Sequence, residues 1–544
     1  MKKKLILIIT AFCIAALSSC GSSSGGDDGS GHMYSLCLNG NPQSLDPQFA
    51  DDPSSDTVIA NMYSGLLKTD ATGAIVCDNA ESYDISQDGL KYTFKLRHDN
   101  YWFNDKNHND CADEGEYFTV TADDYVFAFN RLLSPDTQAP HADNFVCIKG
   151  ASDMLQGKSD KLAGVTSADA YTLVFTLEYA DADFLNLLTT SAAMPCNEEF
   201  FYGTKGRYGL DDKSVMSNGS FFVRQWFYDP YGSHNILYMK KNSVNNVNDE
   251  IYPSYLSFDI EKNSSDIEKS FKSGDVDCMT SMNFSKSYNK RKFSYIKSQS
   301  LTLGLIFNKN DKVYSNQNLR KAIALSIDRN ELSKEIDDDL SPAYGLVPDA
   351  IKLLGRSYRE LCSDSGMSVF DKNAAVKCLE KAKEEIGAQS FPTVKILVSA
   401  DTVNSDYIHL VSQQLQDTLG YYIGVEEVTT NEFKTRISSG DYSVALYPVT
   451  ADYNSGVSFL KQFKDECIGI SEKTGQAIDK LDHIENSSDY VGNFSSTEKM
   501  ILDEYCYVPI FYKNTYLVCK KENKDMLYDP FSGAVNYKDA KNFG

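Results

Sequence analysis

The sequence has few of the residues that commonly build catalytic or metal centres. Its 544 residues include only seven histidines, and neither HExxH nor GxGxxG occurs. The thirteen cysteines form no CxxC pair. These absences disfavour a metalloenzyme, a nucleotide-binding enzyme and a catalytic metal or cofactor. Because dispersed catalytic groups leave no local motif, a hydrolase stays an alternative.

Positive charge is also scarce. The chain carries 53 Lys and Arg against 76 Asp and Glu, a formal net charge of −23. Both nucleic acids and anionic membrane surfaces attract basic patches, so the balance argues against either as a partner. Beyond the N-terminal leader, no apolar run approaches the length of a membrane-spanning helix. We therefore expect a soluble body of two or three domains that does not bind nucleic acid.

The N-terminus has the pattern of an export signal. Lys2, Lys3 and Lys4 precede an apolar stretch, residues 5–17, that is too short to span a bilayer. The ending Leu17-Ser-Ser-Cys20 resembles a bacterial lipobox, in which the cysteine is lipidated and becomes the new N-terminus. We predict a lipoprotein signal peptide at 1–19, a lipid anchor on Cys20 and a flexible tether at 20–33. An ordinary signal peptide cut near Ser19 is the alternative.

Alternating strand and helix patterns follow. Strands are expected at 34–38, 90–96, 171–177, 394–398 and 422–428, and helices at 56–67, 125–133, 318–327, 371–385 and 405–419. This rhythm predicts an α/β protein with a parallel or mixed sheet covered by helices on both faces. No repeat or obvious linker divides the body, so the domains are expected to be discontinuous.

Two local features leave alternatives open. Asp105, Asn107, Asn109, Asp113 and Glu116 match positions 1, 3, 5, 9 and 12 of an EF-hand-type calcium loop, although Asp110 stands where glycine is usual. A polar surface loop between a strand and a helix explains the segment without metal.

The cysteines leave a second question open. Eleven remain beyond the leader, an uneven number that favours free, buried thiols. A bridge between Cys506 and Cys519 is the alternative.

Motifs in order along the body resemble those of bacterial extracellular solute-binding proteins of family 5, the peptide-binding lipoproteins of oligopeptide ABC importers. They are Ser44-Leu-Asp-Pro47, Asp88-Gly89 with Tyr92-Thr-Phe-Lys-Leu-Arg97, Thr121-Ala-Asp-Asp124 through Arg131, Asn218-Gly219 with Trp226, Leu319-Arg320 through Asp328-Arg329, and Ala451-Asp452-Tyr453.

The resemblance implies a two-lobed periplasmic-binding-protein-like fold, of the large type II or cluster C form, that closes on its ligand. Lobe I is expected at 34–63, 193–303 and 514–544, with an extra subdomain at 64–192, and lobe II at 304–513. The protein would act as a monomer without catalysis, receiving an oligopeptide and passing it to the permease subunits of the importer.

The resemblance also implies site residues. Asp452 is the candidate partner of the peptide ammonium. An ammonium group enclosed between the lobes needs a carboxylate beside it, because a buried unpaired charge is costly. Asp51 and Tyr512 are further candidates for contact with the ligand. Relatives often carry an arginine where this chain has Leu446, and Pro448 cannot donate a backbone N–H. The alternatives within the same fold are a nickel chelate, haem, a sugar or a signalling peptide as ligand, and a ligand-sensing lipoprotein.

Overall fold

The computed structural model describes residues 33–541 except 233, 246–250, 261–262, 282–291, 363–365, 368, 401, 484–486 and 521–525. The predicted signal peptide, Cys20 and all of the tether except Met33 lie outside the described residues. None of the described helices is long and apolar enough to cross a membrane.

Lobe I is built on two four-stranded sheets. The first has the order β1-β12-β11-β10, with β1 (Met33–Leu38) parallel to β12 (Tyr255–Ile260) and the hairpin β10 (Phe221–Phe227) and β11 (Ile236–Lys241) beyond. The second has the order β4-β5-β9-β8. Its strands are β4 (Ala80–Ile85), β5 (Lys91–Leu96), β9 (Thr172–Thr176) and β8 (Val165–Asp169). One hydrophobic cluster contains both Tyr34 of the first sheet and Phe175 of the second, so the extra subdomain shares the core of lobe I.

Short elements complete lobe I. They are α1 (Pro53–Met62), β2 (Leu67–Thr69), β3 (Ile75–Cys77), β6 (Tyr101–Phe103), β7 (Tyr117–Thr119), α2 (Ala122–Leu132), α3 (Ala151–Leu155), α4 (Phe184–Leu187), α5 (Glu198–Gly203), α6 (Ser264–Ser273), β22 (Leu527–Tyr528) and β23 (Val535–Asn536). The helix expected at 56–67 is α1, and the predicted end was wrong. At Tyr63 the chain is extended, and the Gly219 N–H donates to the Met62 carbonyl. A Cβ on Gly219 would lie 2.7 Å from that backbone, so only glycine fits this approach.

Lobe II is built on a mixed seven-stranded sheet of order β13-β21-β14-β20-β18-β19, with β15 added to β21. At β13 and the adjoining end of β21 this sheet reaches into lobe I, where Cys278 and Cys519 belong to the lobe I core cluster. The strands are β13 (Cys278–Ser281), β21 (Tyr507–Lys520), β14 (Phe293–Phe307), β20 (Val444–Thr450), β18 (Lys395–Ser399), β19 (Gly424–Val428) and β15 (Leu340–Pro342). The short hairpin β16 (Lys352–Leu353) and β17 (Arg356–Ser357) lies beside it.

Helices cover both faces of the lobe II sheet, as predicted. Because side chains alternate along a strand, Leu305 of β14 enters one core cluster while Ile306 enters the other. The covering helices are α7 (Gln317–Leu325), α8 (Arg329–Glu335), α9 (Tyr358–Leu361), α10 (Lys372–Ile386), α11 (Ser405–Leu419), α12 (Thr430–Ser439), α13 (Gly456–Lys461), α14 (Glu472–Asp479) and α15 (Ser487–Glu504). Several begin at a side-chain cap, for example Asp371 before α10.

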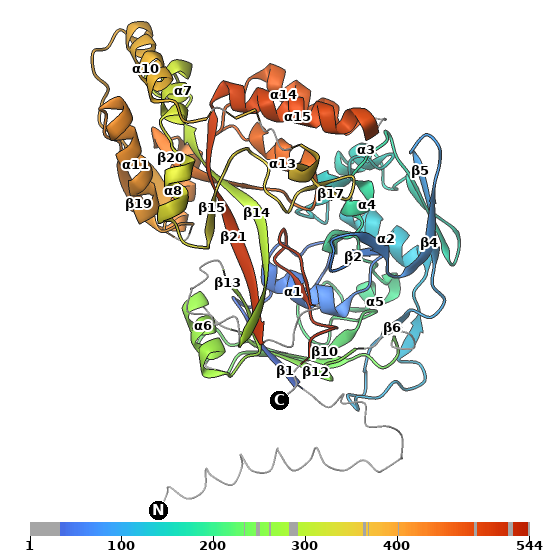
Figure 1. Ribbon diagram of the computed structural model, residues 1–544. Coiled ribbons are helices and arrows are strands. Elements are labelled where there is room, and N and C mark those ends of the chain that lie inside the picture. The colour runs from blue at the N-terminus through green and yellow to red at the C-terminus, as the bar shows by residue number, and fades with distance from the viewer. Residues whose placement is uncertain are drawn as a thin grey trace, which may run out of the picture.

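The long antiparallel strands β14 and β21 run side by side from one lobe into the other (Figure 1). Their register shifts between Ser298 and Leu301 and again between Leu303 and Gly304. The second shift coincides with the boundary predicted at 303/304. The domain boundaries themselves stay a prediction.

The disulfide considered between Cys506 and Cys519 is excluded. Both are free thiols, and Cys506 directly precedes β21 whereas Cys519 lies near its far end. At about 3.3 Å per residue, an extended strand places them roughly 40 Å apart.

Candidate functional site

Strand β20 has an open edge that ends where the lobes meet. It pairs with β14 along its whole length, but with β18 only at Val444 and Ala445, although β18 continues to Ser399. The Asn308 N–H bonds to the Ser443 carbonyl, which sets the alternation of the ladder with β14. Pro448 therefore falls at a non-hydrogen-bonded position, and its missing donor does not weaken the sheet. The open edge presents the carbonyls of Pro448 and Thr450 and the Thr450 N–H.

Asp452 follows this edge directly. Its side chain is exposed, and its Oδ1 accepts one long hydrogen bond, 3.4 Å, from Gln462. The Asp452 N–H donates to the Ser458 hydroxyl at 3.2 Å, which holds the turn before α13. No ion pair to Asp452 is found among the described residues. The carboxylate is therefore available to a cation.

The next three residues reach lobe I. Tyr453 packs against the lobe I core cluster. The Asn454 side chain accepts from the Lys352 N–H at 3.1 Å, and Lys352 Nζ donates to the Thr72 carbonyl of the extra subdomain at 2.6 Å. The Ser455 hydroxyl donates to Asp183. The loop after β20 thus joins the two lobes.

Asp183 is a buried carboxylate at this junction. It is 3% exposed, and Oδ2 accepts from Ser455 and from the Tyr490 hydroxyl, 3.3 Å away in α15. Burial, with the neighbouring charge of Asp181, raises the pKa of Asp183 to about 7. Burial also raises the pKa of Asp181, and the charge of Asp482 adds to it. Sequence reasoning missed this contact, because nothing in the sequence 179–183 shows that a distant helix covers it.

The other predicted site residues lie elsewhere. The Asp51 side chain is 66% exposed and its Oδ1 lies 3.4 Å from His141 Nε2. Tyr512 is buried in β21, and its hydroxyl donates to the Gly345 carbonyl at 3.0 Å. None of the described contacts joins Asp452, Asp51 and Tyr512, so their shared role in a site stays a prediction.

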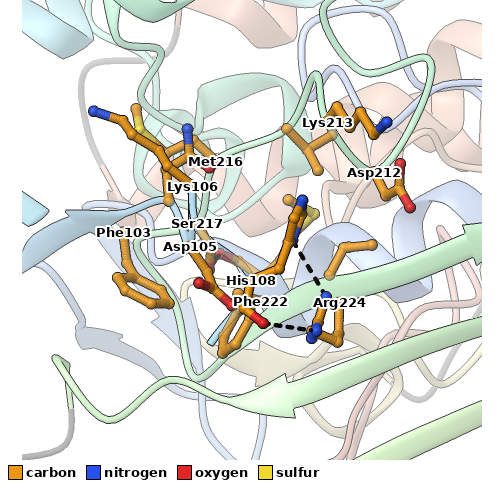
Figure 2. Close-up of a pocket in the computed structure, with 14 residues that line it drawn as sticks. Phe103, Asp105, Lys106, His108, Asp212, Lys213, Met216, Ser217, Phe222 and Arg224 are labelled. Atoms are coloured by element: carbon orange, nitrogen blue, oxygen red, sulfur yellow. Dashed lines mark hydrogen bonds between the residues drawn. The ribbon is translucent and has the colours of Figure 1, made fainter. Parts of the chain in front are cut away.

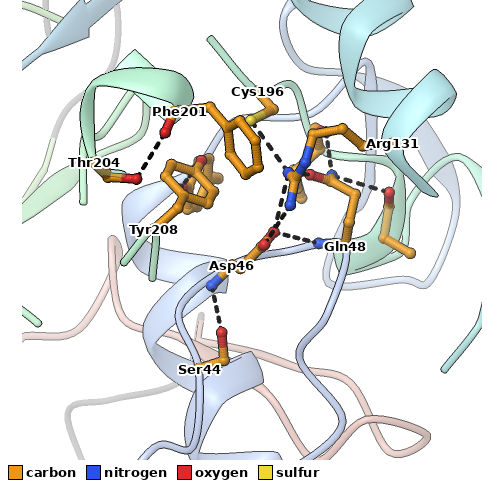
Figure 3. A network of polar contacts seen from close by, with 11 residues as sticks. Ser44, Asp46, Gln48, Arg131, Cys196, Phe201, Thr204 and Tyr208 are labelled. Carbon is orange, nitrogen blue, oxygen red and sulfur yellow. Dashed lines mark hydrogen bonds and ion pairs between the residues drawn. The ribbon is translucent and has the colours of Figure 1, made fainter. Parts of the chain in front are cut away.

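Two of the family motifs meet in a structural ion pair. Arg131, in the last turn of α2, bonds to Asp46 at 2.5 Å and to Gln48 at 2.8 Å (Figure 3). Its guanidinium lies 4.0 Å from the Phe201 ring centroid. Removing one member would strand a buried charge, which is strongly destabilising. These motifs hold lobe I together.

The loop considered for calcium uses its oxygens internally. Glu116 accepts from the backbone N–H groups of Lys106 and Asn107 at 3.0 and 3.2 Å, and the side-chain amides of Asn107 and Asn109 both donate to Asp113. Among the described residues, no group of three or more His, Cys, Asp or Glu side chains is placed to hold a metal ion.

Arg224 of β10 ties the same loop to the sheet. Figure 2 shows it bonded to His108 beside a cavity of about 270 Å³. Arg224 Nε also lies 2.6 Å from Asp110. The loop is therefore anchored by protein groups.

Two lobes crossed by a pair of long strands, with an open strand edge and an unpaired carboxylate at their junction, define a binding protein that holds its ligand between lobes. The chain belongs to the bacterial extracellular solute-binding proteins of family 5, whose profile, described as "family 5 Middle", matches residues 74–468. It is therefore an extracytoplasmic solute-binding protein.

Two oligopeptide-binding proteins match most or nearly all of the chain. It is 26% identical to the oligopeptide-binding protein OppA of Bacillus subtilis over 99% of both chains. It is 26% identical to the periplasmic oligopeptide-binding protein OppA of Haemophilus influenzae, over 88% of this chain and 87% of that one. Among solved structures, the pheromone receptor PrgZ matches with a TM-score of 0.71 and 25% identity, over 94% of this chain and 99% of that one. Peptide-bound OppA of Listeria monocytogenes, 23% identical with a TM-score of 0.69 over 94% and 100%, shares the fold.

Proposed function

We propose that this protein captures oligopeptides between its lobes and delivers them to an ABC importer, without catalysis of its own. The observation that carries the proposal is the open edge of β20 ending at the exposed, unpaired Asp452. An extended peptide can add to such an edge through its backbone, whatever its side chains, and its ammonium then meets a carboxylate. The names of the relatives support a peptide ligand.

The proposal includes the membrane anchor and the roles of Asp51 and Tyr512. Lipidation of Cys20 would hold a monomeric receptor near the permease subunits, and residues 20–33 would let it move. Asp51, exposed just before α1, would face the ligand from lobe I. Tyr512 would support the pocket wall from β21.

The test is a ligand screen on the mature chain without its lipid. The chain is unfolded and refolded to remove carried-over ligand, and its thermal midpoint is measured with peptide pools of two to eight residues. A ligand that binds only the folded state raises the midpoint. We expect a rise confined to certain lengths. If the thermal midpoint rises with sugars or metal chelates but with no peptide pool, the protein remains a member of the family and the peptide ligand is refuted.

A further inference from the structure

Two buried thiols face each other where the chain leaves and re-enters lobe I. Cys278 of β13 and Cys519 of β21 are opposite residues on neighbouring antiparallel strands, and their Sγ atoms are 3.6 Å apart. Their exposures are 1% and 0%, and both are free. They are 241 residues apart along the chain, and nearly all of lobe II lies between them.

The ladder places this pair at the position where side chains come closest. The Lys520 N–H donates to the Asp277 carbonyl at 3.3 Å, so the pair next to the cysteines is the hydrogen-bonded one. Cys278 and Cys519 therefore form a non-hydrogen-bonded pair, for which the Cα atoms are about 4.5 Å apart. That separation lies within the range of disulfides, about 4.4–6.8 Å. Rotation of the side chains can therefore bring the sulfur atoms into bonding distance.

The register around the pair is fixed by charge and backbone contacts. Lys520 Nζ lies 2.5 Å from Asp277 Oδ1, and the other carboxylate oxygen, Oδ2, accepts from the Ser35 N–H at 2.9 Å. The Asp277 N–H donates to the Ser35 carbonyl at 2.7 Å. These contacts hold β1, β13 and β21 together at this point. They therefore oppose a shift in register between β13 and β21 that would separate the two thiols.

We propose that Cys278 and Cys519 are a disulfide-forming site that closes lobe II into a covalent loop rooted in lobe I. The oxidant is a low-molecular-weight or protein disulfide, which extracytoplasmic compartments commonly supply. One thiolate attacks it and forms a mixed disulfide, and the second thiolate then displaces the bound sulfur. Two S–H bonds are lost and one protein S–S bond forms. The oxidant takes up two electrons and two protons and leaves as two thiols.

Burial decides when the reaction occurs. It raises the pKa of the Cys278 thiol well above the ordinary value, with the neighbouring Cys519 adding to the effect. A protonated, inaccessible thiol is a poor nucleophile. We therefore expect the bond to form while the chain folds and to form slowly, if at all, once the native state is reached.

The experiment is refolding of the full mature chain in two buffers, one with a mixture of oxidised and reduced glutathione and one with excess reductant. After refolding, free thiols are alkylated in denaturant and a non-reducing digest is analysed by mass spectrometry. The expected result is one cross-linked species joining the peptides that contain Cys278 and Cys519, with two fewer free thiols. The thermal midpoint should rise by about 5 °C, because the loop closed in the unfolded state is long.

The control variants separate this pair from the other thiols. Cys278→Ala and Cys519→Ala should each abolish the cross-link and the oxidation-dependent rise, whereas Cys506→Ala should keep both. If either variant fails to fold, the digest of the unmodified chain decides. Alkylation of both cysteines after oxidative refolding, or a cross-link between other cysteines, would overturn the proposal. Failure here leaves peptide capture intact, since the ligand screen does not depend on this bond.

Discussion

The pH dependence of stability should change when Asp183 is replaced by Asn. In the folded protein the carboxyl lies among Ser455, Tyr490 and Asp181, with the Lys461–Asp482 ion pair nearby, and its pKa is about 7. Its ordinary value is 3.8. The folded state therefore binds this proton more tightly than the unfolded state does. Asn keeps a side-chain oxygen that can accept from Ser455 and Tyr490, but it does not titrate.

The sign and size follow from linkage. The tightly held proton contributes its full share to the free energy of unfolding at pH values below 3.8, the pKa in the unfolded state. This contribution is lost as the pH rises from there through about 7, the pKa in the folded state. A pKa difference of about 3 between the folded and the unfolded state corresponds to about 4 kcal/mol of stability over the whole pH range, and roughly 3 kcal/mol of it is lost between about pH 5 and 8. For a chain of this length that is about 3 °C in the thermal midpoint if both lobes unfold together.

The assay compares thermal midpoints of the unmodified chain and Asp183→Asn at several values between about pH 5 and 8. Because many groups titrate, the quantity that matters is the difference between the two proteins at each pH. We expect Asp183→Asn to gain about 3 °C on the unmodified chain as the pH rises. Asp84→Asn, at an exposed position of the same subdomain, should track the unmodified chain. A difference that stays constant with pH would refute a proton held on Asp183.

Three further predictions concern the ligand edge and the loop at 105–116. Asp452→Ala should cost about 2–5 kcal/mol of peptide affinity by calorimetry, with the midpoint of the free protein unchanged, and unaltered affinity would remove Asp452 from the site. Pro448→Ala should restore an edge donor and improve affinity by about 0.5–1.5 kcal/mol; a loss would contradict the assigned ladder phase. Glu116→Ala should lower the midpoint equally with and without calcium, since Glu116 accepts from backbone N–H groups, and a calcium-dependent difference would restore the metal site.

The secondary structure that repeats a simple pattern could be predicted from the sequence. The strand expected at 34–38 is β1, and the helix expected at 405–419 is α11 with those same limits. Their apolar spacing and caps act locally, so the sequence reveals them. The end of α1 could not be predicted, because Gly219, more than 150 residues away, determines where the helix stops.

The candidate site divides in the same way. Asp452 was found through a motif, and the structure shows an exposed carboxylate there. Asp183 carries no motif, and its environment comes from Ser455 and Tyr490, which are brought to it only by the packing of the lobes. Tyr512 lies on a strand with apolar neighbours and is buried, and β15 pairs with β21 opposite it, at Ser341.

The family motifs include residues that maintain the fold as well as residues that could contact the ligand, and only the structure distinguishes the two. Asp46 and Arg131 belong to motifs, yet they neutralise each other inside lobe I, so they fix the scaffold and say nothing about the ligand. Pro448 lies outside any motif, yet it stands on the open edge of β20, where a ligand backbone would pair, whereas the Leu446 side chain is buried in the lobe II core. Selectivity in this protein should consequently follow the residues in which it departs from its relatives, and a motif-based assignment of ligand length would miss it.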